Sequence, residues 1–324
     1  MNAIALISGG LDSLLAAKVI KDQGINVTGL HFEHGYSTAD YGKAFKVPEQ
    51  IGVQVEIIDI RQEFLEILSN PAHGFGKSAN PCIDCHAFML KKAGKEMTAR
   101  KAEFIVTGEV LGQRPMSQTL PALKLIEKES GLSDRLLRPL SAKLLPETLP
   151  ERTGWVDRTK LFDFRGRTRH GQIELAVRSG IEIYPQPAGG CLLTDENIGR
   201  RVRDILKHRR ITVEDAELVR LGRHFRVAEN VKVIVGRNLA ENESLAAHKT
   251  GRVFLDTDSH KGPSALIEGN ADGAALQTAG QLIARFSDAA KGEKVTFNVE
   301  NIGRMSTFTV KNDYDESIIS KWRV

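Results

Sequence analysis

The sequence contains no run of about 18 apolar residues, the length that a membrane-spanning helix needs. Its first residues, MNAIALISGG, include neither the basic region nor the cleavage site of a signal peptide. These two absences predict a cytoplasmic protein with no membrane partner. Only three of the 324 residues are cysteine, and cysteines of cytoplasmic proteins more often bind metals or take part in catalysis than form structural disulfides.

The chain also lacks a strong excess of either charge, since its net charge is only +4. The charges are unevenly distributed, because residues 135–223 contain 18 lysines and arginines but 12 acidic residues. A basic stretch of this kind is typical of a surface that binds a polyanion, but a solvated helical face would have the same composition. Charge alone leaves both interpretations open.

Strand-like apolar segments alternate with helical segments in the first part of the chain. The expected strands cover residues 3–7, 26–32, 53–60 and 103–110, and the first helix covers residues 11–21. This alternation predicts an α/β fold built on a doubly wound parallel sheet. Such sheets bind their ligands beyond the carboxyl ends of the strands.

Prolines between residues 139 and 150 mark the expected end of this first domain. The stretch that follows is basic and helical, and its clearest helix is TDENIGRRVRDILKHRR, with Thr194 as the expected N-cap. Strand-like and helical patterns then predict a small α+β domain. The predicted organisation is an α/β domain over 1–150, a basic helical segment over 151–225 and a C-terminal domain over 226–324.

The motif SGGLDS directly follows the first expected strand and opens the first helix. The amino end of a helix carries unpaired N–H groups and the positive end of the helix dipole, and Gly9 and Gly10 allow an anion to approach closely. Ser8 and Ser13 add hydroxyl donors, and Asp12 is suited to the Mg²⁺ that accompanies a polyphosphate. The motif is neither a Walker A loop nor G-x-G-x-x-G.

In this position SGGLDS resembles the pyrophosphate-binding loop of the PP-loop ATP pyrophosphatases, whose fold is adenine nucleotide alpha hydrolase-like. Enzymes of this superfamily activate a carbonyl-type oxygen by adenylation and release pyrophosphate. The resemblance covers the α/β domain and implies ATP and Mg²⁺ as cofactors. It places Ser8, Gly9, Gly10, Asp12 and Ser13 at the phosphates, and His31 and Phe32 beside the adenine.

The three cysteines suggest a metal centre. Cys82 and Cys85 form a C-x-x-C pair in NPCIDCHAFM, and Cys191 lies far along the chain. Two thiolates three residues apart can hold one metal centre, and a distant third can complete the set. With no fourth cysteine, a 4Fe–4S cluster would keep one iron open for a ligand such as sulfide. This arrangement resembles that of the iron–sulfur tRNA thiolation enzymes.

Other uses of these cysteines stay open. Zinc bound by the three thiols and His86 is one alternative. Related thiouridylases that lack a cluster use two cysteines for a persulfide and a resolving thiol. Three unrelated buried thiols are a third alternative. The stretch CIDCH also fits the haem-attachment pattern, which the missing export signal disfavours.

A further motif, TGEVLGQRPMSQT, follows the fourth expected strand, where the ligand cleft should lie. It resembles the T-G-E-x-x-G-Q-x-x-S-Q stretch of 4-thiouridine synthetases, which lines their adenylate site. The resemblance implies that Gly108 and Gln113 contact the nucleotide. An ordinary strand-to-helix loop is the alternative.

The C-terminal part contains VIVGRNLAENESL and DTDSHKGPSALI. These stretches resemble the RNA-binding domain of the NFACT family, although the second lacks a histidine of that pattern, and a cap without RNA contacts is the alternative. Upstream, RGRTRHGQ and RRVRDILKHRR suit an RNA backbone, because a guanidinium is always charged and binds phosphate through two hydrogen bonds. The predicted RNA-binding residues are Arg165, Arg167, Arg200, Arg203, Lys207, Arg237 and Lys261.

Together these features predict an ATP-dependent tRNA sulfurtransferase that adenylates a uridine carbonyl oxygen and replaces it with sulfur. Free sulfide or a partner cysteine desulfurase would supply the sulfur. Three other functions stay open: sulfur or nitrogen transfer to a small molecule, non-catalytic RNA binding by a metal protein, and removal of sulfur from thiolated bases. The sequence indicates neither the modified nucleotide nor the oligomeric state. The predicted catalytic residues are Asp12, Cys82, Cys85 and Cys191, of which the three cysteines are the predicted metal ligands.

Overall fold

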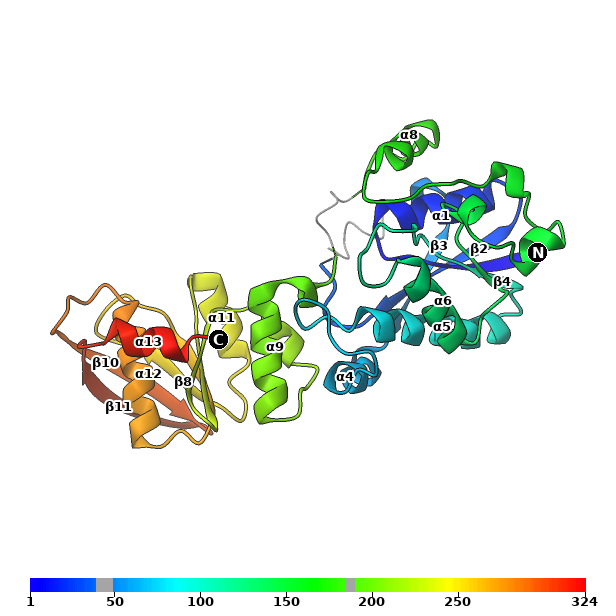
Figure 1. Ribbon diagram of the computed structural model, residues 1–324. Coiled ribbons are helices and arrows are strands. Elements are labelled where there is room, and N and C mark those ends of the chain that lie inside the picture. The colour runs from blue at the N-terminus through cyan, green and yellow to red at the C-terminus, as the bar shows by residue number, and fades with distance from the viewer. Residues whose placement is uncertain (39–48, 185–189) are drawn as a thin grey trace. The chain divides into compact units, whose positions relative to one another are not determined.

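In the computed structural model, which describes residues 1–38, 49–184 and 190–324, the chain divides into two compact units (Figure 1). The first unit is Met1–Asp195 and the second is Glu196–Val324. This division differs from the three parts expected from the sequence, because the basic stretch is shared between the two units. No helix among the described residues is long and apolar enough to span a membrane.

A five-stranded parallel sheet forms the centre of the first unit. Its strand order is β3-β2-β1-β4-β5, so the direction of winding reverses between β1 and β4. Ligands of doubly wound sheets bind at this switch point, beyond the carboxyl ends of the two strands. SGGLDS follows β1 and TGEVLGQ follows β4. The strands are β1 (Asn2–Leu6), β2 (Asn26–Glu33), β3 (Gln54–Asp59), β4 (Phe104–Val106) and β5 (Leu136–Leu137).

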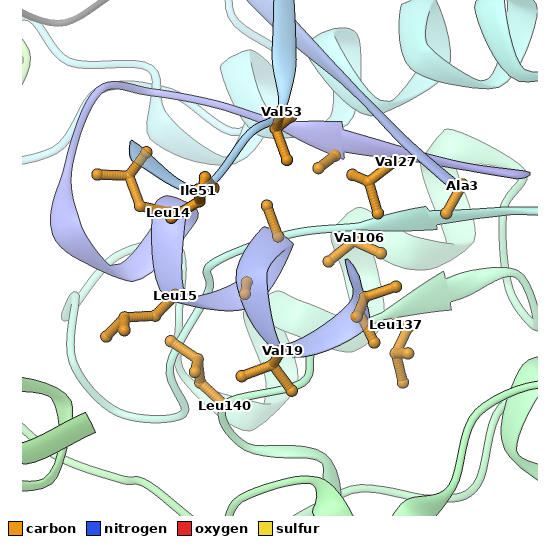
Figure 2. Packing of buried hydrophobic residues seen from close by; sticks show 14 of the residues in the cluster. Ala3, Leu14, Leu15, Val19, Val27, Ile51, Val53, Val106, Leu137 and Leu140 are labelled. Atoms are coloured by element: carbon orange, nitrogen blue, oxygen red, sulfur yellow. The ribbon is translucent and has the colours of Figure 1, made fainter. Parts of the chain in front are cut away.

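Helices cover both faces of this sheet because alternate residues of each strand point to opposite sides. Ala3 and Ala5 of β1 belong to the core beneath α1, whereas Ile4 packs with α5 and α6. Figure 2 shows the first of these layers, in which Val19 of α1 and Val106 of β4 contribute to one cluster. The expected doubly wound fold is therefore confirmed. The α-helices of this unit are α1 (Leu11–Lys21), α4 (Arg61–Ser69), α5 (Cys82–Ala99), α6 (Leu120–Ser130), α7 (Leu149–Arg152) and α8 (His170–Arg178).

The stretch after residue 150 folds onto the first sheet. Residues 162–164 run along residues 139–140, and backbone hydrogen bonds of 2.8 and 2.9 Å join the two segments. Apolar contacts therefore place residues 151–195 in the first unit, although their composition is basic. Four side chains of this stretch are buried in the same core as α1: Val156, Leu161, Ala176 and Ile181.

The second unit is an α+β domain, as expected, with a six-stranded antiparallel sheet. The strand order is β11-β10-β8-β9-β7-β6. The strands are β6 (Arg223–Ala228), β7 (Val231–Val235), β8 (Val253–Thr257), β9 (Ala265–Gly269), β10 (Lys294–Asn301) and β11 (Arg304–Lys311). The helices are α9 (Glu196–His208), α10 (Asp215–Leu218), α11 (Leu239–Ala247), α12 (Gly273–Arg285) and α13 (Glu316–Trp322).

Ion pairs attach α9 to the sheet of the second unit. Asp204 accepts a hydrogen bond of 2.7 Å from Arg226 on β6 and lies 3.1 Å from the Nζ atom of Lys232 on β7. The predicted N-cap of this helix was wrong. Thr194 lies in a 3-10 turn, and its hydroxyl donates to the carbonyl of Cys191 at 2.7 Å instead of capping α9.

Candidate active site

The turn between β1 and α1 has the form of an anion-binding loop. Gly9 adopts the left-handed conformation with a φ of 79°, and Gly10 is the N-cap of α1. The Ser13 hydroxyl donates to the Gly10 carbonyl at 2.8 Å and lies 3.3 Å from the backbone N–H of Ser8. The side chain of Ser13 thus stabilises the turn. Because the N-cap is glycine, no bulky side chain covers the positive end of α1 at the carboxyl edge of the sheet.

Gly108, the second residue after β4, lies directly against this turn. A Cβ atom at Gly108 would come within 2.4 Å of the Ser13 nitrogen and 2.6 Å of the Asp12 carbonyl oxygen. Both contacts are to backbone, which cannot swing aside as a flexible side chain can. Only glycine therefore permits this approach between the loop after β4 and the loop after β1.

Three segments of the first unit meet at Asp12. Gln113 Nε2 donates to Asp12 Oδ2 at 2.7 Å, and Gln172 Nε2 donates to Gln113 Oε1 at 3.0 Å. Arg169 Nη2 lies 3.6 Å from Asp12 Oδ1, a buried oxygen that accepts no hydrogen bond from the described residues. Sequence reasoning missed Arg169 and Gln172, because the motif RGRTRHGQ indicates positive charge but not the surface to which it folds.

The two residues predicted beside the adenine point to opposite faces of β2. His31 Nδ1 lies 2.7 Å from the carbonyl oxygen of Ile7, the residue that precedes Ser8. Phe32 belongs to the core between the sheet and α5. The structure thus brings His31 to the start of the turn of residues 8–13, the predicted nucleotide loop, whereas Phe32 contributes to packing.

Cys82 and Cys85 occupy the first turn of α5, which places both thiols at the same end of the first unit's sheet. Asn80 Nδ2 donates to the Cys82 sulfur at 3.1 Å. Cys191 comes from a distant segment and is fixed by an isolated antiparallel bridge to Ser37, in the loop that follows β2. In addition, the Ser78 hydroxyl donates to the carbonyl of Asp195 at 2.8 Å. These bonds tie the third cysteine to the loops around the other two.

The charges of the other two cysteines act on the Cys85 thiol. Burial raises the pKa of the Cys85 thiol well above its ordinary value, and the negative charges of Cys191 and Cys82 raise it further. Burial also raises the pKa of Cys82, while Asn80 and Arg114 act in the opposite direction. Across residues 1–38, 49–184 and 190–324, no group of three or more cysteine, histidine or acidic side chains has the spacing of a metal site. The metal centre therefore stays a prediction.

The buried carboxylate of Glu109 connects α5, the helix that carries Cys82 and Cys85 and is here called the cysteine helix, to Arg138. Glu109 accepts hydrogen bonds of 2.9 Å from Arg138 Nε and 2.9 Å from His86 Nδ1. Arg138 also donates to Glu127 at 2.8 Å. Burial alone would raise the pKa of Glu109, but the Arg138 charge and the hydrogen bonds lower it to about 2. Sequence reasoning missed Glu109, although it stands in the TGEVLGQ motif, and its partner Arg138 directly follows β5.

The loop of residues 107–118 thus contacts both the nucleotide loop and the cysteine helix. Gly108 and Gln113 touch the start of α1. Glu109 binds His86, the neighbour of Cys85 on α5, and the charge of Arg114 opposes the burial that raises the pKa of Cys82. One short loop therefore determines the relative positions of the two predicted reaction sites.

The predicted RNA-binding residues are distributed over both units. Arg200, Arg203 and Lys207 are exposed on one face of α9, and the opposite face is buried. Arg237 is exposed, and its Nε donates to Glu241 at 2.9 Å. The three others, Arg165 and Arg167 in the first unit and Lys261 in the second, are also exposed.

Two family models match the chain. Residues 1–143 match the family described as thiamine biosynthesis protein (ThiI), and residues 222–323 match the NFACT protein RNA binding domain. Residues 1–143 are thus similar to the ThiI family, and residues 222–323 are similar to an NFACT-type RNA-binding domain. This result confirms both resemblances seen in the sequence. Residues 144–221, which include α8, α9 and Cys191, lie outside the two matched ranges.

Individual relatives are tRNA-modifying enzymes. A tRNA-specific 2-thiouridylase MnmA of Campylobacter curvus is 34% identical over 96 residues, which cover 28% of this chain and 28% of that protein. A probable tRNA sulfurtransferase of Thermococcus kodakarensis is 31% identical over 144 residues, which cover 43% of this chain and 36% of that protein. The chain therefore spans only 28% and 36% of the length of these two relatives.

A solved structure of a 4-thiouridine synthetase–RNA complex with bound ATP aligns with 67% of this chain and 52% of its own, at 20% identity and a TM-score of 0.36.

Proposed function

We propose that this protein is an ATP-dependent tRNA sulfurtransferase, which forms AMP and pyrophosphate. The observation that carries the proposal is the loop of residues 107–118, which contacts the start of α1 through Gly108 and the cysteine helix through Glu109. An enzyme that activates an oxygen with ATP and then displaces it with sulfur needs both reagents at one carbon atom. The curated relatives are thiouridylases and sulfurtransferases of tRNA, which supports tRNA as the substrate.

In the first step, ATP binds with its phosphates at the turn of residues 8–13. The uridine carbonyl oxygen attacks the α-phosphorus, an O–P bond forms, and the bond to pyrophosphate breaks. Backbone N–H groups at the start of α1 stabilise negative charge on the departing pyrophosphate. Asp12 is the residue suited to hold Mg²⁺, because its Oδ1 atom is buried and accepts no hydrogen bond from the described chain.

In the second step, a sulfur nucleophile held at Cys82, Cys85 and Cys191 attacks the activated carbon. A C–S bond forms, the C–O bond breaks, and AMP leaves with the former uridine oxygen. A base in a folded tRNA reaches such a site by leaving its stack. Free sulfide or a cysteine desulfurase would supply the sulfur atom.

A 4Fe–4S cluster fits the donor set in its chemistry, because the charges of Cys82 and Cys191 both act on the Cys85 thiol and the chain has no fourth cysteine. Held by Cys82, Cys85 and Cys191, the cluster would supply an open iron position for sulfide. It would also offset the burial that disfavours the thiolate form of Cys85. Anaerobic purification with iron, sulfide and zinc analysis would separate a cluster from zinc and from persulfide chemistry without metal.

The exposed face of α9 is proposed to bind the RNA backbone. Replacing Arg200, Arg203 and Lys207 together by alanine should weaken tRNA binding uniformly across sequences. It should also reduce the slope of log K against log salt by about 2 to 3, since each phosphate contact contributes about 0.9. An unchanged slope would exclude this face from the interface.

Product assays with full-length protein, tRNA, sulfide and ATP under anaerobic conditions test the proposal. Thiouridine is measured by mass spectrometry of nucleosides, and AMP and pyrophosphate are measured in parallel. Cys191→Ala should abolish thiolation and the AMP release that accompanies it but leave tRNA-dependent release of pyrophosphate, whereas Asp12→Asn should reduce the release of both products. Full thiolation by the Cys191 variant, or no AMP formation by the wild type with any tRNA, would contradict the proposal.

A further inference from the structure

The segment that leads into α8 runs beside the loop after β4 and ends near the turn of residues 8–13. Arg165 forms a parallel bridge with Leu111, and the Gly166 N–H donates to the Leu111 carbonyl at 2.8 Å. A Cβ atom at Gly171 would lie 2.6 Å from the Phe164 ring, so glycine allows the first turn of α8 to close over that ring. These contacts fix where α8 begins, beside the loop after β4.

Arg169 is the residue that this path delivers to the nucleotide loop. It is the N-cap of α8, and its Nη2 atom lies 3.6 Å from Asp12 Oδ1. Its side chain is only 16% exposed, and its buried Nε atom has no hydrogen-bond partner in the described part of the chain. Burial of an unpaired donor on a charged group is costly, so such a group is suited to an incoming anion.

A chain of amide hydrogen bonds orients the surroundings of Arg169. Gln172, which is buried, donates to Gln113, and Gln113 donates to Asp12. Because this chain occupies Asp12 Oδ2, it leaves Oδ1 on the side of Arg169. The guanidinium and the carboxylate oxygen therefore lie side by side at the start of α1, as an ion pair.

The nucleotide loop itself supplies no cation. Residues 1–17 contain no lysine or arginine, so no side chain of that stretch adds a positive charge to the positive end of α1. Transfer of a nucleotidyl group builds charge on the departing pyrophosphate, and a fixed cation stabilises that charge. A guanidinium is well shaped for this purpose, since its planar fork binds phosphate oxygens through two hydrogen bonds.

We propose that Arg169 binds the β- and γ-phosphates of ATP and stabilises the departing pyrophosphate. This inference rests on the proposed function, in which ATP occupies the turn of residues 8–13. Arg169 lies outside the ThiI-matched range of residues 1–143. The extension that carries α8 therefore completes the nucleotide site of the ThiI-type domain.

The test compares Arg169→Met and Arg169→Lys with a matched control, Arg178→Met. Arg178 lies on the same helix, but its side chain is 76% exposed and pairs with Glu174 within the helix. Calorimetry with the full-length protein and Mg²⁺ measures the affinities for ATP, pyrophosphate and AMP. We expect Arg169→Met to bind ATP and pyrophosphate about 10- to 100-fold more weakly, with AMP affinity unchanged. Arg169→Lys should recover part of the loss, and the control should match the wild type.

The AMP measurement also reports whether each variant is folded. Equal loss of AMP and ATP affinity in Arg169→Met would show a structural role and overturn the inference. Unchanged ATP affinity in that variant, with normal binding by the wild type, would overturn the inference alone. A wild type that binds neither ATP nor pyrophosphate would overturn the proposed function, and the inference with it.

Discussion

The buried Glu109 carboxylate provides a quantitative test of how the first unit is held together. Its folded-state pKa of about 2 lies below the ordinary value of 4.5, because Arg138 and His86 stabilise the charged form. A depressed pKa contributes stability above the unfolded-state value, and that contribution is lost as the pH falls through the folded-state value. The difference corresponds to about 3 kcal/mol of the free energy of unfolding at neutral pH.

We expect Glu109→Gln to lower the free energy of unfolding by about 3 kcal/mol at pH 5.5. The difference in the free energy of unfolding between variant and wild type should decrease by about 2 kcal/mol as the pH falls from 5.5 to 3, because only the wild type loses the Glu109 carboxylate charge. Other acids titrate in both proteins, so the difference isolates Glu109. Glu56→Gln is the matched control, since Glu56 also pairs with an arginine, Arg100, but its side chain is 53% exposed. Glu56→Gln should lower the free energy of unfolding by less than about 1 kcal/mol.

Tryptophan fluorescence allows this measurement on the first unit alone. The chain has two tryptophans, Trp155 against the core of the first unit and Trp322 against the core of the second. Urea titrations in a Trp322→Phe background follow Trp155 only. A gap between wild type and Glu109→Gln that does not change with pH, or that is no larger than for the exposed control, would refute the reasoning.

Three further expectations concern single sites. Gly108→Ala should weaken ATP binding about tenfold or more, because the added Cβ atom would lie 2.4 Å from backbone. Gly273→Ala is the control and should bind ATP normally, because its added Cβ atom would have no neighbour within 4 Å. Equilibrium binding of ATP measures both variants. Asp215→Asn should cost about 3 kcal/mol or more in urea unfolding followed by Trp322 fluorescence, since Asp215 is fully buried and pairs with Arg209 at 2.6 Å. Ile302→Asn should raise the midpoint of thermal unfolding of the second unit, because Ile302 is 86% exposed and holds a φ of 49° that strains a branched side chain but suits asparagine. A lower midpoint would contradict this.

The first sheet could be predicted from the sequence because its information is local. Short apolar runs alternate with helical periods, and SGGLDS and TGEVLGQ each follow a strand directly. The topology then brings the two motifs together, since β1 and β4 are neighbours at the switch point of the sheet. Gly108 shows the limit of this reasoning: a motif indicates that glycine matters there, but only the structure shows the backbone that a Cβ atom would strike.

The segment after residue 150 could not be assigned correctly, because its most visible property is not the one that determines its fold. Its arginines suggest a solvated RNA-binding helix, yet a few irregularly spaced apolar residues, such as Val156 and Ala176, attach it to the first core. The same limit applies to Cys191. Nothing in its spacing from Cys85 predicts proximity, which depends on the bridge to Ser37 and on the turn held by Thr194.

The proposed reaction requires that activation and sulfur delivery act on the same carbon. The structure contains contacts that hold the cysteines and the turn of residues 8–13 at fixed positions relative to each other. Glu109 and Gln113 are separated by three residues, and the first binds the cysteine helix while the second binds Asp12. A shift at either end would strain the buried ion pair between Glu109 and Arg138 or break the hydrogen bond to Asp12. A strong, pH-dependent contribution of Glu109 to the free energy of unfolding would thus also bear on the reaction. It would mean that the distance between the thiols and the nucleotide loop is fixed by a contact that is costly to disturb.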